Sequence, residues 1–228
     1  MEDASKKRGR KKQMKNFILD IDGTLWDSTG VVAVGWNRAL KEAAVPELDG
    51  LVITADSLKK EFGKPMDVIA DDLFGDIDPT KKAALLKLCC KYEHEAIVEN
   101  TKDITFPGVR ETLRALSGKK AGCTKCGLYI VSNCQDGYIE LVMEKNGITD
   151  IISDYECFGR TGLQKDENIR LVIERNKLEN VMYVGDTAGD FEASKKAGVP
   201  FVFASYGFGS VTGANYEIKE FADLLKLV

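Results

Sequence analysis

Two aspartates, Asp20 and Asp22, stand where the chain leaves a short apolar run, in the sequence Asp-Ile-Asp-Gly-Thr. The preceding residues 17–19 are typical of a strand buried in a parallel sheet that is covered on both faces. Open α/β sheets bind their ligands at the carboxyl ends of such strands. Two carboxylates this close in the sequence repel each other unless a positive charge compensates them, and a divalent cation is the usual source of that charge. The spacing therefore favours a cation site, and a surface turn is the alternative that these five residues alone leave open.

Polar side chains also follow two later apolar runs. One run ends in a hydroxyl and an amide, the other ends in a segment with two further aspartates, and a lysine precedes a helical pattern between them. These groups are Ser132 and Asn133 after residues 128–131, Asp186 and Asp190 after residues 181–184, and Lys165 in Gly-Leu-Gln-Lys-Asp. Three strand ends with polar groups and one lysine form a constellation suited to phosphate and a metal ion.

Together these residues resemble, in order, the four motifs of the haloacid dehalogenase superfamily of phosphotransferases, over about residues 15 to 205. The four motifs together are specific where each alone is weak. Asp27, Ser28 and the Phe-Gly-Lys-Pro segment look most like the phosphoglycolate-phosphatase branch, which carries a helical cap. The resemblance therefore implies a Rossmann-like α/β core, an inserted helical cap, and a flexible neck at residues 22–29 that opens and closes the cap.

The resemblance also implies a reaction, the hydrolysis of a small phosphomonoester. Asp20 would attack phosphorus and form an aspartyl-phosphate, because a carboxylate can act as a covalent nucleophile. Asp22 would protonate the leaving oxygen and then take a proton from water, which requires a raised pKa. The other implied roles are phosphate binding by Thr24, Ser132, Asn133 and Lys165, and Mg²⁺ binding by the Asp20 carboxylate, the Asp22 backbone carbonyl, Asp186 and Asp190, the last directly or through water.

Other activities share parts of this pattern. Dehalogenases of the superfamily need no metal and lack the second aspartate, so Asp22, Asp186 and Asp190 argue against that activity. Sugar phosphomutases of the β-phosphoglucomutase type share all these residues and are the main alternative. A non-catalytic phosphate-binding protein on the same fold is a further alternative. Structural roles also exist for single residues, with Lys165 as a surface lysine and Ser132 as a helix cap, but the joint match favours chemistry.

Lys64 stands between Gly63 and Pro65, in the segment that separates two expected cap helices. Proline disfavours a helical conformation in the residue before it, so the pattern predicts a fixed irregular corner. In the capped family this corner approaches the nucleophile and helps to select the leaving group. A lysine there would favour a substrate with a second anionic end, and the alternative is a solvated lysine on the cap surface.

The order of the elements predicts an α/β protein with a doubly wound parallel sheet and an inserted all-helical cap. Residues 30–100 show helical spacing and no convincing strand, whereas the later part alternates strands and helices. Such alternation implies right-handed crossovers. The predicted division is a basic head at residues 1–14, a core of residues 15–29 and 101–228, and a cap of residues 30–100. Further short strands are expected at residues 151–154 and 201–203, and a final helix at residues 216–228.

The composition fits one domain with a sizeable core, because 44% of the 228 residues are hydrophobic and 30% are charged. No run approaches the roughly 20 apolar residues of a membrane span, and no signal-peptide pattern is visible, so we expect a cytoplasmic protein without membrane contact. Residues 1–13 carry six basic and two acidic side chains, which leaves 26 basic and 34 acidic ones elsewhere. An acidic body argues against nucleic acid and leaves a small phosphorylated metabolite as the expected partner. The basic residues 6–12 are typical of a disordered tail, with a nuclear address as the alternative.

Six cysteines are irregularly spaced, so reduced thiols are expected in an intracellular chain. The exception is Cys123-Thr-Lys-Cys126, a spacing that can bind zinc or cycle between thiols and a disulfide. A structural zinc site requires four ligands, and the chain has no second pair of this kind. A glycine-flanked hairpin that leads into the strand at residues 128–131 is therefore the favoured interpretation.

Overall fold

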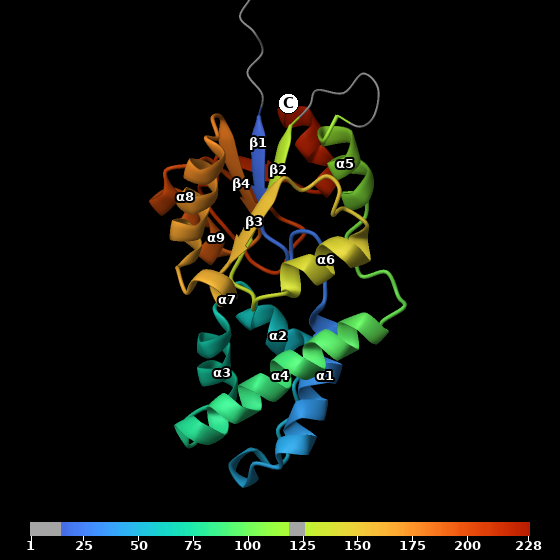
Figure 1. Cartoon of the computed structure of the whole chain (residues 1–228), viewed down its shortest axis with the longest axis vertical. Coiled ribbons are helices and arrows are strands. Elements are labelled where there is room, and N and C mark those ends of the chain that lie inside the picture. The colour runs from blue at the N-terminus through green and yellow to red at the C-terminus, as the bar shows by residue number, and fades with distance from the viewer. Residues whose placement is uncertain (1–14, 119–125) are drawn as a thin grey trace, which may run out of the picture.

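The computed structural model describes residues 15–118 and 126–228, and a six-stranded sheet forms its centre. The strands follow the order β3-β2-β1-β4-β5-β6, and every neighbouring pair is parallel. Their bounds are Asn16–Leu19 for β1, Gly127–Ser132 for β2, Asp154–Cys157 for β3, Val181–Gly185 for β4, Phe201–Ala204 for β5 and Tyr216–Ile218 for β6. The predicted doubly wound parallel sheet is confirmed, and β1 lies between β2 and β4 near its middle (Figure 1).

Continuous apolar runs form the inner strands because helices cover both faces of the sheet. Every residue of β1, β2, β4 and β5 is buried, which is the pattern expected between two helical layers. One face packs against α5 (Val109–Leu116), α6 (Tyr138–Asn146) and the 3₁₀ helix η2 (Phe221–Leu227). The other face packs against α8 (Lys165–Asn176) and α9 (Ala188–Ala197). A short helix, α7 (Phe158–Thr161), links β3 to α8.

Residues 29–99 form a group of helices beyond the carboxyl ends of the strands, which we call the helical layer (Figure 1). Its members are α1 (Thr29–Ala43), the 3₁₀ turn η1 (Pro46–Leu48), α2 (Ala55–Glu61), α3 (Met66–Phe74) and α4 (Pro79–Glu99). The helices α1 and α4 lie so close that a Cβ on Gly35 would be 2.5 Å from the Tyr92 carbonyl oxygen. Only glycine permits this approach. Residues 30–100 contain no strand, as predicted.

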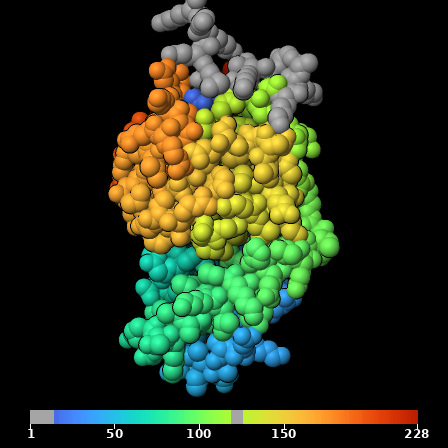
Figure 2. All heavy atoms as spheres, viewed as in Figure 1, coloured from blue at the N-terminus to red at the C-terminus, as the bar shows by residue number. Residues whose placement is uncertain are grey.

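The helical layer lies directly against the sheet region. Figure 2 shows atoms of the layer, coloured blue to green, in contact with yellow and orange atoms on one face of the molecule. Residues 62–65 form the predicted irregular corner between α2 and α3. At this corner the Asn133 side chain donates from Nδ2 to the Gly63 carbonyl oxygen at 2.7 Å. The corner is therefore one point where the layer is bonded to the loop after β2.

The structure corrects two predicted elements. The strand expected at residues 151–154 begins only at Asp154, because Ile151 turns into the core after α6. The single helix expected over residues 216–228 is wrong, since Tyr216–Ile218 pairs with β5 and only Phe221–Leu227 is helical. Pairing with β5 satisfies backbone groups that an exposed strand edge would leave open.

Some predictions fall outside the described part of the chain, namely those on the basic head at residues 1–14 and on Cys123. Cys126 is described and buried just before β2. Within the described residues, no helix combines the length and the apolar character that crossing a membrane requires.

We expect Leu85→Ala in α4 to lower the free energy of unfolding by about 2–5 kcal/mol, the range for a buried leucine whose removal leaves a cavity. Leu85 is 0% exposed, whereas Val98 on the same helix is 49% exposed. Val98→Ala is the matched control and should change stability by less than about 0.5 kcal/mol. Urea unfolding followed by circular dichroism measures both, and equal effects would contradict the packing described for α4.

Candidate active site

The register of the central strands brings two aspartates together at one edge of the sheet. Leu19 of β1 pairs with Val184 of β4, and the Asp20 N–H donates to the Val184 carbonyl oxygen at 2.8 Å. Asp20 and Asp186 therefore lie at a similar height along the strand direction, each just after the end of one of two neighbouring strands. Gly23 has a φ of +84°, and a Cβ there would lie 2.1 Å from Asp186 Oδ2. Only glycine accommodates both this backbone angle and the approach of the carboxylate.

A third carboxylate completes an all-oxygen cluster. One carboxylate oxygen from each of Asp20, Asp186 and Asp190 lies within 4.8 Å of the others, and all three residues are buried. Asp190 comes from the first turn of α9. Mg²⁺ prefers oxygen ligands. Three buried carboxylates beside one lysine leave negative charge that a divalent cation would compensate, so these residues fit Mg²⁺.

Lys165 is the cation that contacts this cluster. Its Nζ donates to Asp20 Oδ1 at 3.0 Å and to Asp190 Oδ1 at 2.6 Å, and its side chain is 5% exposed. The second Asp190 oxygen, Oδ2, accepts from the Asp186 N–H and from the N–H and hydroxyl of Thr187 at 2.7–3.2 Å. Because both of its oxygens are occupied, Asp190 anchors Lys165 and suits a water-mediated contact with a metal better than a direct one.

Burial and crowding make these carboxylates difficult to ionise together. Burial raises the pKa of Asp20, and the Asp190 charge adds to the rise while the Lys165 charge opposes it. Burial also raises the pKa of Asp186, and the charges of Asp190 and Asp20 raise it further. At Asp190 burial raises the pKa, but the Lys165 ammonium and the Thr187 donors outweigh it, so the pKa lies below its usual value. A further cation would stabilise the ionised forms of Asp20 and Asp186.

Asp22 lies in a different environment, outside the carboxylate cluster. Its Oδ1 accepts from Trp26 Nε1 at 2.9 Å, from Ser28 Oγ at 2.6 Å and from the Tyr138 hydroxyl at 2.8 Å. Burial raises the pKa of Asp22 to about 6, although the Ser28 and Tyr138 donors oppose the rise. A carboxyl group with this pKa can hold and release a proton near neutral pH, as an acid–base group must.

Part of the predicted phosphate-binding set lines a single cavity. Ser132, the last residue of β2, and Asn133 line this cavity together with the two aspartates of the first motif. Lys165 reaches the same place through its contact with Asp20. Thr24 is not among the residues that line the cavity, and its buried hydroxyl donates to Asp186 Oδ1 at 3.4 Å. The structure therefore places the Thr24 hydroxyl against the Asp186 carboxylate and not in the wall of the cavity.

Lys64 lines the same cavity from the corner between α2 and α3. Its Nζ forms ion pairs with Asp72 at 2.7 Å and Glu61 at 2.6 Å, and its side chain is 42% exposed. Hydrogen bonds to Asp72 and Glu61 raise the pKa of Lys64. The lysine is thus charged, but carboxylates of the helical layer already compensate that charge.

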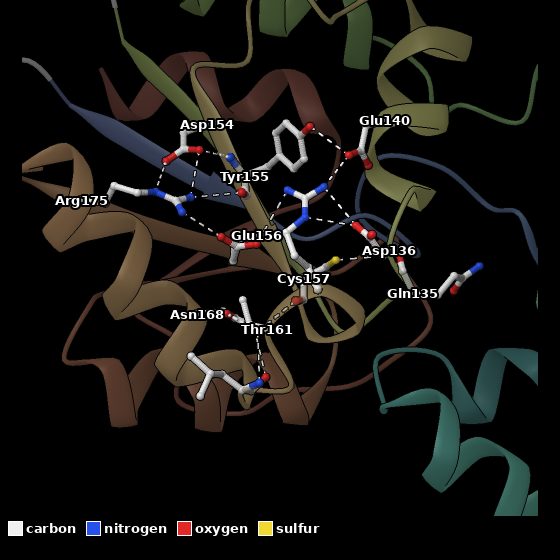
Figure 3. A network of polar contacts seen from close by, with 12 residues as sticks. Gln135, Asp136, Glu140, Asp154, Tyr155, Glu156, Cys157, Thr161, Asn168 and Arg175 are labelled. Atoms are coloured by element: carbon white, nitrogen blue, oxygen red, sulfur yellow. Dashed lines mark hydrogen bonds and ion pairs between the residues drawn. The ribbon is translucent and has the colours of Figure 1, made fainter.

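The loop after β2 is held from behind by residues that follow β3. Asp136 and Glu140 point toward the same guanidinium group (Figure 3), that of Arg160, which donates to them at 3.1 Å and 2.5 Å. A Cβ on Gly159 would lie 2.4 Å from the Asp136 nitrogen and 2.6 Å from the Gln135 Cα. This close backbone contact and the ion pairs fix the loop that carries Gln135.

Sequence reasoning missed several groups that complete the site. Tyr138 donates to Asp22 although 116 positions separate them in the sequence, and no local pattern marks such a contact. Glu93 lines the cavity from α4 and is buried. A signal for Glu93 did exist, because it follows Leu85 and Cys89 at intervals of four on the buried stripe of α4. A charged residue on an otherwise apolar stripe indicates a function or a buried partner.

We expect Gly23→Ala to weaken Mg²⁺ binding by about ten- to a hundredfold, the range for changes to groups that orient metal ligands. The added Cβ would displace the Asp186 carboxylate and strain a left-handed backbone angle. Gly30→Ala in α1 is the control, because a Cβ there meets no atom within 4 Å. Calorimetric titration with MgCl₂ measures both affinities. An unchanged affinity in a folded Gly23→Ala protein would show that Asp186 is not a ligand.

Comparison with known proteins points to the same superfamily as the sequence motifs. The family model described as haloacid dehalogenase-like hydrolase matches residues 17–204. Two curated relatives, from Aquifex aeolicus and Escherichia coli O157:H7, are both named phosphoglycolate phosphatase. The first is 26% identical over 94% of this chain and 97% of its own length. The second is 29% identical over 86% of this chain and 82% of its own length.

Solved structures share the fold. A predicted phosphoglycolate phosphatase from Haemophilus somnus has a TM-score of 0.79 and 22% identity, with 96% of this chain and 99% of that chain covered. A mutant of CbbY from Rhodobacter sphaeroides, in complex with xylulose-1,5-bisphosphate, has a TM-score of 0.74 and 17% identity, with 93% and 96% covered. At these identities the similarity shows the fold alone. Because the family model covers most of its length, the chain belongs to the haloacid dehalogenase-like hydrolase family.

Proposed function

We propose that this protein is a Mg²⁺-dependent cytoplasmic phosphatase that hydrolyses a small phosphomonoester through an aspartyl-phosphate on Asp20. The main support is the buried ion pair of Lys165 with Asp20 beside two further buried carboxylates. Such an arrangement suits a ligand that brings concentrated negative charge together with a divalent cation. The family, and the relatives named phosphoglycolate phosphatase, agree with this activity.

Asp20 is the proposed nucleophile. A hydrogen bond from its N–H to β4 fixes its backbone, and Lys165 holds its Oδ1 at 3.0 Å. A carboxylate held in one orientation has little freedom left to lose on attack. Attack would form a bond from an Asp20 oxygen to phosphorus and break the bond to the leaving oxygen. Water would then cleave the new bond and release inorganic phosphate, while Lys165 and Ser132 bind the transferring oxygens.

Asp22 is proposed to give the leaving oxygen its proton and then to accept a proton from the attacking water. The pKa of about 6 supports this role, because both protonation states are accessible near neutral pH. The described donors Trp26, Ser28 and Tyr138 all bond to Oδ1. The other oxygen, Oδ2, is therefore the one proposed to transfer the proton.

Mg²⁺, when bound, would compensate charge on the phosphoryl oxygens. Asp20 and Asp186 are the proposed carboxylate ligands, with Asp190 acting through water and Thr24 orienting Asp186. The backbone carbonyl of Asp22 is the further proposed ligand. Among the described residues no backbone N–H donates to that carbonyl, which agrees with this role.

We further propose that residues 30–100 act as a cap on a core formed by residues 15–29 and 101–228, with residues 1–14 as a separate head. Lys64 lies in this cap and lines the cavity above Asp20. Because Glu61 and Asp72 compensate its charge, we propose Lys64 as a hydrogen-bond donor to the leaving group. Its presence alone does not select an anionic substrate.

Asp20→Asn should lower the turnover number by at least about a thousandfold, because it removes the nucleophile and one metal ligand. Release of inorganic phosphate from p-nitrophenyl phosphate measures the effect, and circular dichroism checks that the variant is folded. EDTA should stop the wild-type reaction and Mg²⁺ should restore it. Near-normal activity in folded Asp20→Asn protein, or full activity in excess EDTA, would contradict the mechanism.

The same assay separates a phosphatase from a phosphomutase. A phosphatase transfers the phosphoryl group to water, so inorganic phosphate should accumulate without a bisphosphate activator. Conversion of a hexose 1-phosphate to the 6-phosphate with little free phosphate would favour the mutase.

Lys64→Ala should lower kcat/KM for a small substrate with a polar tail by about ten- to a hundredfold, which corresponds to about 1.5–3 kcal/mol for a charge-assisted hydrogen bond. Its effect on p-nitrophenyl phosphate should be small, because the nitrophenyl group offers no matching polar end. Lys60→Ala, at an exposed position of α2, is the control. Equal losses on both substrates would reject the contact with the leaving group.

A further inference from the structure

Glu93 is a buried carboxylate in the wall of the proposed active site. It belongs to α4, is 4% exposed, and lines the same cavity as Asp20 and Asp22. Trp36 Nε1 donates to its Oε2 at 2.8 Å, and Gln135 Nε2 donates to its Oε1 at 2.8 Å. Among the described residues, Glu93 forms no ion pair. Burial raises the pKa of Glu93, and its carboxyl group has neutral donors but no cation.

A carboxylate at this position is unexpected for packing alone. Glu93 shares the buried stripe of α4 with Leu85, Cys89, Ala96 and Ile97. An apolar side chain would fill such a position without the large free-energy penalty of burying a charge. Two donors also leave part of the carboxylate's acceptor capacity unused, because two oxygens can accept about four hydrogen bonds. The unused capacity belongs to a residue that lines the cavity.

Asn133 adds a second free acceptor to the same cavity. Its Oδ1 is buried and has no hydrogen-bond partner, and Asn133 lines the cavity with Glu93. The orientation of the amide follows from its other end, since Nδ2 donates to the Gly63 carbonyl oxygen. A buried acceptor without a protein partner is rare, and a donor from water or from a ligand would satisfy it.

The cavity lining supplies acceptors but little free positive charge. Lys64 is the only lysine or arginine among the described residues that line it. Its ammonium already contacts Glu61 and Asp72. Lys165 contacts Asp20 and Asp190 and is not among the residues that line this cavity. The wall that would surround the leaving group is therefore acidic and rich in acceptors.

We propose that the substrate's leaving group is a hydroxylated, uncharged one, such as a polyol or a sugar, whose hydroxyl groups donate to Glu93 and Asn133. This proposal rests on the phosphatase function proposed above and specifies its substrate class. A hydroxyl would supply the missing donor at Asn133 and a further donor to Glu93. A carboxylate at the same place would meet a buried negative charge and an unpaired acceptor, so the wall excludes it. The chain thereby differs from relatives named phosphoglycolate phosphatase, because glycolate carries a carboxylate.

Three phosphomonoesters of one size test the far end of the leaving group. The probes are 2-hydroxyethyl phosphate, phosphoglycolate and phosphoethanolamine, which end in a hydroxyl, a carboxylate and an ammonium on the same two-carbon skeleton. With Mg²⁺ and the full-length protein, kcat/KM for the hydroxyl compound should exceed that for phosphoglycolate by at least about tenfold, as expected for the loss of a charge-assisted hydrogen bond. It should also exceed the value for phosphoethanolamine, because burying an ammonium costs solvation that a new ion pair with Glu93 offsets only in part.

The variant Glu93→Gln separates specificity from a structural role of this residue. It keeps the shape and one acceptor oxygen but removes the charge. The preference for 2-hydroxyethyl phosphate over phosphoglycolate should fall by about tenfold, since repulsion of the carboxylate is lost. Glu99→Gln on the exposed side of the same helix is the control and should leave the ratio unchanged. A purely structural role would lower kcat/KM for both substrates by the same factor, which would overturn the proposal.

Other outcomes also decide against the hydroxylated leaving group. It is overturned if phosphoglycolate or phosphoethanolamine is the best of the three probes. It is equally overturned if none of the three is turned over while p-nitrophenyl phosphate is hydrolysed, because the phosphatase is then active without the inferred preference. Absence of hydrolysis of p-nitrophenyl phosphate with Mg²⁺ would instead count against the phosphatase function itself. The wild-type comparison stands even if Glu93→Gln fails to fold.

Discussion

The buried ion pair of Lys165 with Asp20 and Asp190 is the interaction on which the rest of the site depends. Three carboxylates meet within 4.8 Å at the edge of the sheet, and the lysine is the cation that contacts them. A buried charge without a partner destabilises a folded protein by several kcal/mol. The Lys165 ammonium compensates part of this negative charge, and it also contacts Asp20, the proposed nucleophile. The Lys165 ammonium therefore serves both the stability of the fold and the proposed reaction. One ammonium does not neutralise three carboxylates, so a further cation would stabilise the folded state.

The arrangement of the strands brings the carboxylates together. Parallel pairing of β1 with β4 sets Asp20 beside the segment that carries Asp186. Gly23 has no side chain, so the Asp186 carboxylate can lie against its backbone. Asp22, two residues from the nucleophile, is bound instead by a tyrosine from α6 and by local donors. Two neighbouring carboxylates thus receive separate environments, one made by a cation and one by neutral donors. This division supports the different roles that we propose for them in a single reaction.

Sequence patterns predicted the parts of this protein that follow from local order. Apolar runs that end in polar residues located β1, β2 and β4, and their parallel arrangement placed Asp20, Ser132 and Asp186 at one edge. The pairing of Tyr138 with Asp22 could not be predicted, because it depends on where α6 packs and not on a repeat in the sequence. The strand at Tyr216–Ile218 was missed because its three residues are stabilised by the edge of β5 more than by their own pattern. The compensation of Lys64 by Asp72 depends in the same way on the packing of α3. Local signals therefore predicted which residues meet at the site, whereas the contacts that surround these residues depend on tertiary packing.

The loop after β2 has a consequence for the opening of the proposed cap. Two of its amide side chains, Asn133 and Gln135, bond to the helical layer at Gly63 and Glu93, while ion pairs behind the loop fix its position. Separation of the layer from the sheet must break both amide bonds, at about 0.5–1.5 kcal/mol each for neutral pairs and somewhat more for the carboxylate. In the proposed cap, both bonds would have to break before a product leaves, so these two amides hold the closed arrangement over the cavity.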